Sequence, residues 1–339
     1  MKIKSEAISI LKRFGYTERE AGFLYLVANH SGYFTQRQFA KFGSMNSGGM
    51  VTAFTNKLVA RGHASLHRYQ NNAHVFHFHY KGMYSAIDRE DLRNRRAHAF
   101  ESMKSRLAIL DFVVQHLDHH YLENEAEKVQ YFEERFQIRR KDMPGRTYRG
   151  TQQDPDTIWH FVDKFPHFLD ATQNEDPRIT LTFIDPGTGN FNAFKTHLET
   201  YSLFLRPIPR FTFLFANPDV RTFTTAEKIF RDVMDTSSTK LSVQVSRYFK
   251  LRTDWEAKRY GLFNNPDLVY LKLAKKRFSD ETYERTFAEW KAGCLTETNL
   301  NAVIQDQFQA SQDVEFKTYE LPRDYSSFGQ NSQLTSRIP

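Results

Sequence analysis

The chain has 339 residues, of which 40% are hydrophobic and 15% are aromatic, so it can build a packed core and is not a disordered chain. No run approaches the ~18 apolar residues that span a bilayer. The N-terminus lacks a secretory signal, and the single cysteine, Cys294, excludes an intrachain disulfide and a cysteine-rich zinc site. The net charge of +7 is uneven: residues 1–100 hold 15 Lys and Arg against 6 Asp and Glu, or +9, which leaves −2 elsewhere. We expect a cytoplasmic protein with no membrane segment, whose first third meets a polyanion.

Residues 17–62 predict three short helices. Thr17 is followed three residues later by Glu20, the signature of a capping box, and Ser31-Gly32 ends this first helix. The second helix begins at Thr35 and ends at Gly43. The third, in "GMVTAFTNKLVARGH", has an apolar face made by Val51, Phe54 and Leu58, and a polar face made by Thr52, Thr55, Asn56 and Lys57.

Two strands, in "HASLHRYQ" and "AHVFHFHY", flank a predicted hairpin turn at Asn71-Asn72. Alternation puts Phe76, Phe78 and Tyr80 on one face, which we expect in the core, and Val75, His77 and His79 on the other, which we expect to face solvent or nucleic acid. The last two histidines and His67 could begin a metal site. A tetrahedral metal needs further ligands, so we favour a surface strand over a metal site.

Three helices followed by a hairpin resemble the winged helix-turn-helix arrangement, over residues 15 to about 87. The resemblance implies that the third helix enters the major groove of double-stranded DNA and that the hairpin, or wing, lies along the backbone. The predicted contacts are Asn46, Ser47, Thr52, Thr55, Asn56 and Lys57 from the helix and its preceding turn, and Arg61, His67, Arg68, His77 and Lys81 from the wing. The alternative is a winged helix that binds a protein instead of DNA.

Residues 88–122 contain no proline or glycine and predict one long connecting helix with a cationic start. Its apolar stripe, Ala99, Met103, Leu107, Leu110, Val114 and Leu117, has nearly heptad spacing. Two alternatives stay open: the stripe packs on the rest of the chain, or the 92–117 helix pairs with a second copy in a homodimer. We divide the chain into residues 1–87, 88–122, 123–300 and 301–339, and expect the polar end of the last segment to be mobile.

The region from residue 123 predicts a mixed α/β domain, and hence an α+β multidomain fold for the chain. Strands are expected in "TIWHFVDKF", "RITLTFIDPGTG" and "RFTFLFAN", and helices in "NAFKTHLETYSLFL" and "TTAEKIFRDVM", the latter capped by Thr224 or Thr225. Residues 240–300 alternate basic and aromatic positions, as in a helical cap on the sheet or a surface that follows nucleic acid.

The segments "DPDTIWHF", "FIDPGTG" and "FKTHLETY" resemble the bacterial replication-relaxation proteins of plasmids and mobile elements, over residues 15 to 235. This resemblance implies a winged helix joined to a degenerate restriction-endonuclease-like domain. An active nuclease would use Asp156 and Asp185 to hold Mg²⁺ and Lys195 to position water. Phe183 and Gly187 stand where that chemistry expects an acid and a lysine, and "DPGTG" also suits a type II turn that begins at Asp185.

We therefore expect a non-catalytic, nucleoid-associated DNA-binding protein that acts in replication, transfer or transcription control and needs no cofactor. The Mg²⁺-dependent nuclease and a protein-interaction scaffold without nucleic acid are the alternatives.

Overall fold

The computed structural model describes residues 4–46, 48–69, 73–150, 156–170, 177–279, 281–297, 299–300, 302–304 and 312–325, without the side chains of 236–240, 276 and 277. The predicted contact Ser47, the turn at Asn71-Asn72 and the polar end of the chain lie outside these residues. The fold is mixed α+β, as expected. It divides into a first unit (Met1–Phe194, Arg210–Glu227, Val314–Pro339) and a second unit (Lys195–Pro209, Lys228–Asp313). In the described part of the chain, no helix has the length and apolar character to cross a membrane.

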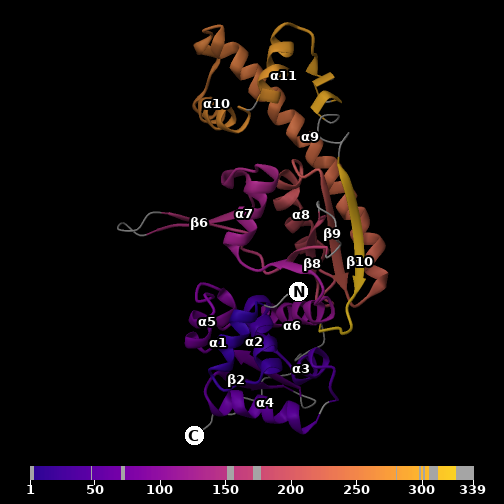
Figure 1. The fold of residues 1–339 in the computed structure, drawn as a ribbon. Helices are drawn as coiled ribbons and strands as arrows, with labels where there is room; N and C mark the ends of the chain where they lie inside the picture. The colour runs from indigo at the N-terminus through magenta and orange to yellow at the C-terminus, as the bar shows by residue number, and fades with distance from the viewer. Residues whose placement is uncertain are drawn as a thin grey trace. The chain divides into compact units, whose positions relative to one another are not determined.

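The N-terminal part of the first unit contains the three predicted helices and the predicted hairpin (Figure 1). Its elements are α1 (Ser5–Lys12), α2 (Glu18–His30), β1 (Tyr33–Phe34), α3 (Gln36–Phe42), α4 (Gly49–Ala60), β2 (Ala64–Arg68), β3 (His74–Phe78) and α5 (Lys81–Ala86). Both predicted caps are confirmed, because Thr17 and Glu20 form a capping box, as do Thr35 and Gln38. The predicted apolar face of α4 is buried.

The hairpin differs from its prediction because β1 pairs with β3. The sheet has the order β1-β3-β2, so β3 is its central strand. Val75 and His77 are therefore buried along with Phe76, and the expectation that His77 faces solvent is wrong. Its ring stacks on Tyr33 with 4.3 Å between centroids. Tyr80, expected in the core, is 40% exposed.

The predicted connecting helix is broken at its start. The structure has 3-10 helix η1 (Arg93–Arg95) and then α6 (Phe100–Gln115), so the helix begins at residue 100 and not near 88. It also ends at residue 115 and not near 122, because strand β4 (His120–Leu122) follows. Arg89 turns inward and pairs with Glu123 at 2.9 Å, and Asn94 donates to Ala28 O and Asn29 O. These buried contacts replace helical ones.

The apolar stripe of α6 packs inside the chain. Met103, Leu107 and Leu110 are at most 3% exposed. The structure therefore favours the first alternative, and this stripe is not available to a second copy of the chain. A dimer through the 92–117 helix is a prediction that we do not retain.

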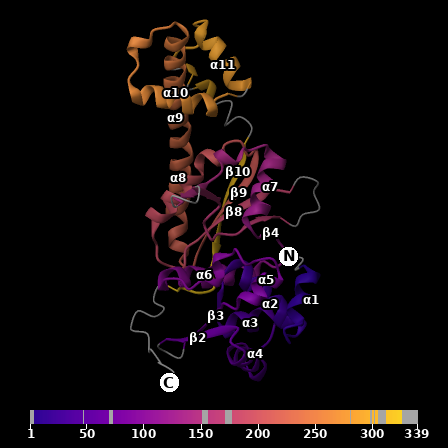
Figure 2. The ribbon, with the colours of Figure 1, turned by 90° about the vertical axis from the view of Figure 1, so that its left-hand side faces the viewer.

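The first unit also contains a five-stranded sheet in the order β10-β9-β8-β7-β4 (Figure 2). Its strands are β4 (His120–Leu122), β7 (His167–Leu169), β8 (Ile179–Ile184), β9 (Arg210–Asn217) and β10 (Asp313–Glu320), with α7 (Glu125–Phe136) and the 3-10 helices η2 (Arg140–Asp142) and η3 (Val220–Thr222) between them. Helix α8 (Phe191–Leu205) begins in this unit, and its residues from Lys195 onward belong to the second unit. Strands β8 and β9 are parallel and nearly uniformly buried, which explains their apolar, β-branched and aromatic sequences. Phe194 of α8 packs on Phe183 and Phe215 of these strands.

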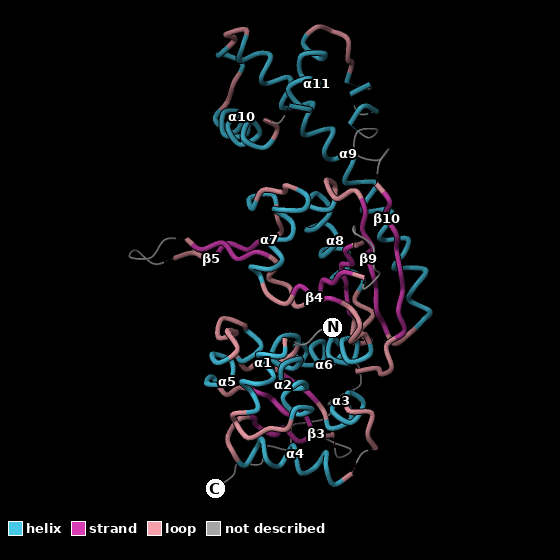
Figure 3. The backbone as a smooth tube through the Cα atoms, in the orientation of Figure 1, coloured by secondary structure: helices cyan, strands magenta, loops and turns pink. Residues whose placement is uncertain are grey.

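The strand in "TIWHFVDKF" is confirmed for residues 157–160 only, and it lies in a different sheet. There β6 (Thr157–His160) pairs with β5 (Gly145–Tyr148) in an antiparallel ribbon of two strands (Figure 3). Strand β10 was not predicted. It pairs with β9 in parallel, because Asp313 N donates to Pro209 O at one end and Leu321 N to Asn217 O at the other.

Residues 321–325, which follow β10, are held by a buried carboxylate on α6. Asp111 accepts hydrogen bonds from Arg37 Nη2 at 2.9 and 2.7 Å, Gln38 Nε2 at 2.9 Å and Tyr325 Oη at 2.7 Å. Asp111 is 5% exposed and Tyr325 1%. One carboxylate thus joins α3, α6 and the end of the described chain.

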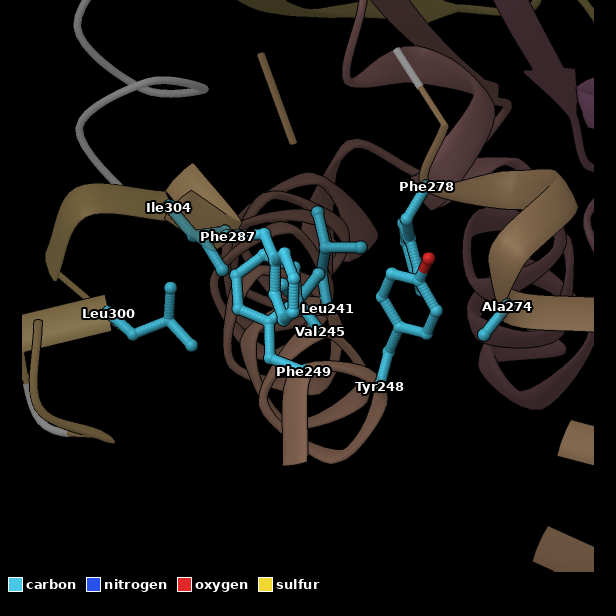
Figure 4. Packing of buried hydrophobic residues seen from close by; sticks show 9 residues of the cluster. All are labelled: Leu241, Val245, Tyr248, Phe249, Ala274, Phe278, Phe287, Leu300 and Ile304. Carbon is cyan, nitrogen blue, oxygen red and sulfur yellow. The ribbon is translucent and has the colours of Figure 1, made fainter. Parts of the chain in front are cut away.

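The second unit is mainly helical. It includes most of α9 (Phe223–Glu256), 3-10 helix η4 (Tyr260–Leu262), α10 (Asn265–Arg277) and α11 (Glu281–Lys291). The predicted helix in "TTAEKIFRDVM" is the start of α9, which begins at Phe223, before either predicted cap. An apolar cluster holds these helices together (Figure 4), and its members are Leu241, Val245, Tyr248, Phe249, Ala274, Phe278, Phe287, Leu300 and Ile304. Aromatic and aliphatic residues of the segment 240–300 therefore build a helical core, which contains none of its basic residues.

Candidate nucleic-acid interface

Helix α4 presents part of its predicted contact face to solvent. Asn46, before the helix, and Thr52 and Asn56, on it, are exposed. Thr55 is fully buried, so its prediction as a DNA contact is wrong. Its hydroxyl donates to Val51 O at 3.2 Å and accepts from Gln36 Nε2 at 2.9 Å. A helix rotates by about 100° per residue, and Thr55 falls beside the buried Val51. A threonine can lie on the buried or on the exposed face of a helix, so residue type alone does not distinguish Thr55 from Thr52.

Lys57 is committed to the fold. Its ammonium forms an ion pair with Glu20 Oε2 at 2.5 Å, and it lies 4.8 Å from the centroid of the Tyr16 ring. The Arg61 guanidinium lies over the same ring at 5.6 Å and donates to Phe14 O. Burial raises the pKa of Tyr16 to about 12, so the phenol is neutral at physiological pH and hydrogen bonds to His63. The Glu20 carboxylate neutralises Lys57, and the exposed Arg61 keeps its charge.

The hairpin holds exposed cations at its two ends. Arg68 pairs with His74 next to the turn, and Lys81 follows β3 at the opposite end, close in sequence to Tyr80. His67 is half-buried, burial lowers its pKa, and its Nε2 lies 3.3 Å from Ser65 Oγ. His77 cannot touch DNA from its buried position. We name Asn46, Thr52, Asn56, Arg61, Arg68 and Lys81 the exposed N-terminal set.

Two apolar side chains on α4 were not predicted as part of this surface. Met50 is 68% exposed and Val59 is 38% exposed. Apolar residues of an amphipathic helix are expected to face the core, and no feature of the sequence indicates that these two are exposed. They lie on the same helix as Thr52 and Asn56, and none of these four exposed side chains is charged.

Asp185, a candidate metal ligand, organises its own turn. Its Oδ1 accepts hydrogen bonds from Gly187 N at 3.2 Å, Thr188 N at 2.8 Å and Thr188 Oγ1 at 2.7 Å. Its Oδ2 accepts from Gly189 N at 2.9 Å and from Asn217 Nδ2 at 3.0 Å. Gly187 has φ +105°, as a type II turn requires. The Asp185 side chain thus holds the residues that follow it, as expected of a residue that begins a turn, and a carboxylate with five donors is a poor ligand for Mg²⁺.

The two predicted catalytic carboxylates lie next to strands of different sheets. Asp156 precedes β6 in the two-stranded ribbon and accepts from Gly150 N, whereas Asp185 follows β8 of the five-stranded sheet. Lys195 is an exposed residue of α8. Within the described ranges, no three His, Cys, Asp or Glu side chains are placed to bind a metal ion together. This holds for the three histidines His67, His77 and His79 as well.

Comparison of the chain with protein-family models, with curated proteins and with solved structures finds no match.

Proposed function

We propose that this chain binds double-stranded DNA, without catalysis, through residues 15–87 in a winged-helix arrangement. The observation that supports this most is the order of elements: α2, α3 and α4 are followed directly by the antiparallel pair β2 and β3. This is the order in which such modules place a helix and a wing against a duplex. The excess of +9 in residues 1–100 supports it as well.

The exposed N-terminal set divides into two chemical groups. Asn56 and Thr52 on α4 can reach base edges, and an asparagine amide can form two hydrogen bonds to adenine. Arg61, Arg68 and Lys81 are suited to phosphate oxygens, where each cation displaces condensed counterions. Affinity would then come mainly from the three cations, and sequence preference from α4. The resemblance to replication-relaxation proteins would place this binding in the replication, transfer or transcription of a plasmid or mobile element.

The test is fluorescence-anisotropy titration of the full chain with a labelled random duplex at low salt. We expect Arg68→Ala combined with Lys81→Ala to weaken binding by about tenfold or more, because two phosphate contacts are lost. Lys57→Ala is a poor probe, since it leaves Glu20 without its partner. The matched control is Lys272→Ala with Arg285→Ala, two exposed cations of the second unit. Equal affinities of the two double variants would contradict the proposal.

One observation favours a second candidate, a protein partner. Met50 and Val59 give α4 an exposed apolar component, and Lys57 is neutralised. In that case the wild-type chain shows no binding to the duplex even at low salt, and the winged helix is a protein-interaction module.

A further inference from the structure

A cavity of about 150 Å³ lies within the first unit, apart from the exposed N-terminal set. It is lined by the end of α2, by η1, by α6 and α7, and by residues 159–166. Three cations, Arg106, Lys128 and Lys164, contribute to the lining, together with His30.

Arg106 is a buried guanidinium without a carboxylate. The side chain is 6% exposed, and its Nη1 donates to Ser31 O at 2.8 Å and to Asn94 Oδ1. Its Nε is buried and has no hydrogen-bond partner. Neither Ser31 O nor the Asn94 amide carries a charge, so no described group neutralises Arg106. Burial lowers its pKa to about 10, which leaves it a cation at neutral pH.

The two lysines lie near carboxylates, Asp163 for both and Glu125 for Lys128, yet burial still lowers the pKa of each. Lys128 is 7% exposed, and its ammonium donates to the carbonyl oxygen of Phe165 at 3.3 Å. Burial and the charge of Arg106 lower the pKa of Lys164 to about 8, and Asp163 offsets part of this. Like charges raise one another's energy when they are brought together away from water. The fold therefore keeps Arg106 and Lys164 close although each disfavours the other.

The acidic residues of the lining are engaged elsewhere. Glu123 pairs with Arg89 at 2.9 Å and accepts from Tyr25. Glu125 accepts from His160 N at 2.7 Å, and Asp163 accepts from Phe165 N at 3.0 Å. The fourth acid, Asp91, is exposed at the rim of the lining. These carboxylates reduce the positive potential of the cavity: the charges of Asp163 and Glu125 act on Lys128, and that of Asp163 acts on Lys164. No carboxylate acts on Arg106 in this way.

We propose that this cavity is a binding site for a phosphate group, held by the Arg106 guanidinium and the Lys164 ammonium. Buried cations are stable when an anion both pairs with them and accepts their hydrogen bonds, and an arginine fork matches phosphate oxygens. Lys128 supplies a third positive charge. The buried Nε2 of His30 has no hydrogen-bond partner and is available to a further phosphate oxygen. The site is independent of the proposed DNA contacts.

The size of the cavity limits the ligand. Pockets for drug-sized molecules have about 300–1,000 Å³, so a space of about 150 Å³ suits a single phosphate group and not a nucleotide. The phosphate could be the free ion or the end of a small monoester. Both present the same terminal oxygens to Arg106 and Lys164.

The test is isothermal titration calorimetry of the full chain at neutral pH and matched ionic strength, with inorganic phosphate, methyl phosphate and acetate as separate probes. We expect the wild-type chain to bind at least one of the two phosphates and to bind acetate more weakly. Lys164→Met should weaken phosphate binding by about tenfold, as the loss of one charge-assisted hydrogen bond implies. Tighter binding of inorganic phosphate supports the free ion, and tighter binding of methyl phosphate supports a monoester.

Lys164→Met is preferred to Arg106→Met, because Arg106 also holds Ser31 and Asn94 and its loss could unfold the unit. Without phosphate, Lys164→Met should melt no lower than the wild-type chain, since it removes an ammonium from beside Arg106. Lys41→Met, at an exposed position of α3, is the matched control and should bind phosphate like the wild type. No binding of either phosphate, or equal binding by Lys164→Met and Lys41→Met, would overturn the proposal.

Discussion

Substitution of Asp111 by alanine should destabilise the first unit strongly. The carboxylate is 5% exposed and accepts from Arg37, Gln38 and Tyr325. Its removal takes away the hydrogen bond that the Tyr325 hydroxyl donates at 2.7 Å, in a side chain that is 1% exposed. Breaking a buried ion pair costs about 3–5 kcal/mol, and because the Arg37 side chain is 40% exposed we expect the lower end, about 3 kcal/mol.

The assay is urea unfolding followed by far-UV circular dichroism, with hydrogen exchange of residues 100–115 to assign the effect to the first unit. A loss of about 3 kcal/mol corresponds to exchange about 100-fold faster for amides that open by unfolding of the unit. Glu90→Ala, which removes an exposed carboxylate, is the control and should stay within about 0.5 kcal/mol. The reasoning is refuted if Asp111→Ala is no less stable than Glu90→Ala.

Three further predictions concern caps, turns and buried histidines. Thr17→Ala should lower the free energy of unfolding by about 1 kcal/mol in urea, because the Glu20 amide loses its cap; no change would show that the box is dispensable. Asp185→Ala should lower the free energy of unfolding by about 1–3 kcal/mol and leave DNA affinity unchanged. If the wild-type chain instead cuts DNA with Mg²⁺ on a denaturing gel and this variant does not, the nuclease alternative is supported. Burial, with His79 and His67, lowers the pKa of His77 from 6.5 to about 4. The folded state therefore favours neutral His77, and this contribution to the free energy of unfolding is complete above pH 6.5. It is lost as the pH falls toward 4, by at most about 3 kcal/mol. His77→Phe should flatten this part of the urea-midpoint profile, and an unchanged slope would argue against it.

Local signals in the sequence located much of the fold. Thr17 and Thr35 each begin a helix with a partner three residues on, and the structure has both capping boxes. The runs in β8 and β9 are apolar, β-branched or aromatic except for Arg210 and Asn217 at the two ends of β9, and the strands form a buried parallel pair. The turn at Asp185 also followed from residue types, because proline and glycine restrict the backbone in a known way.

Non-local contacts account for what was missed. The two residues of β1 are too few to show a pattern, yet they make β3 a central strand and bury His77. Strand β10 pairs with a strand about a hundred residues earlier, and the chain between them gives no sign of it. Arginine is usually a surface residue, so the sequence gives no reason to expect that Arg89 and Arg106 are buried, as they are in the folded chain.

The salt dependence of binding between the wild-type chain and a random duplex tests DNA binding through the N-terminal module. If Arg61, Arg68 and Lys81 each contact a phosphate, the logarithm of the affinity falls against the logarithm of the salt concentration with a slope of about −3, and the slope of Arg68→Ala with Lys81→Ala is smaller by about 2. A slope near zero, a slope that this double variant does not change, or no binding at low salt would contradict DNA binding through the N-terminal module.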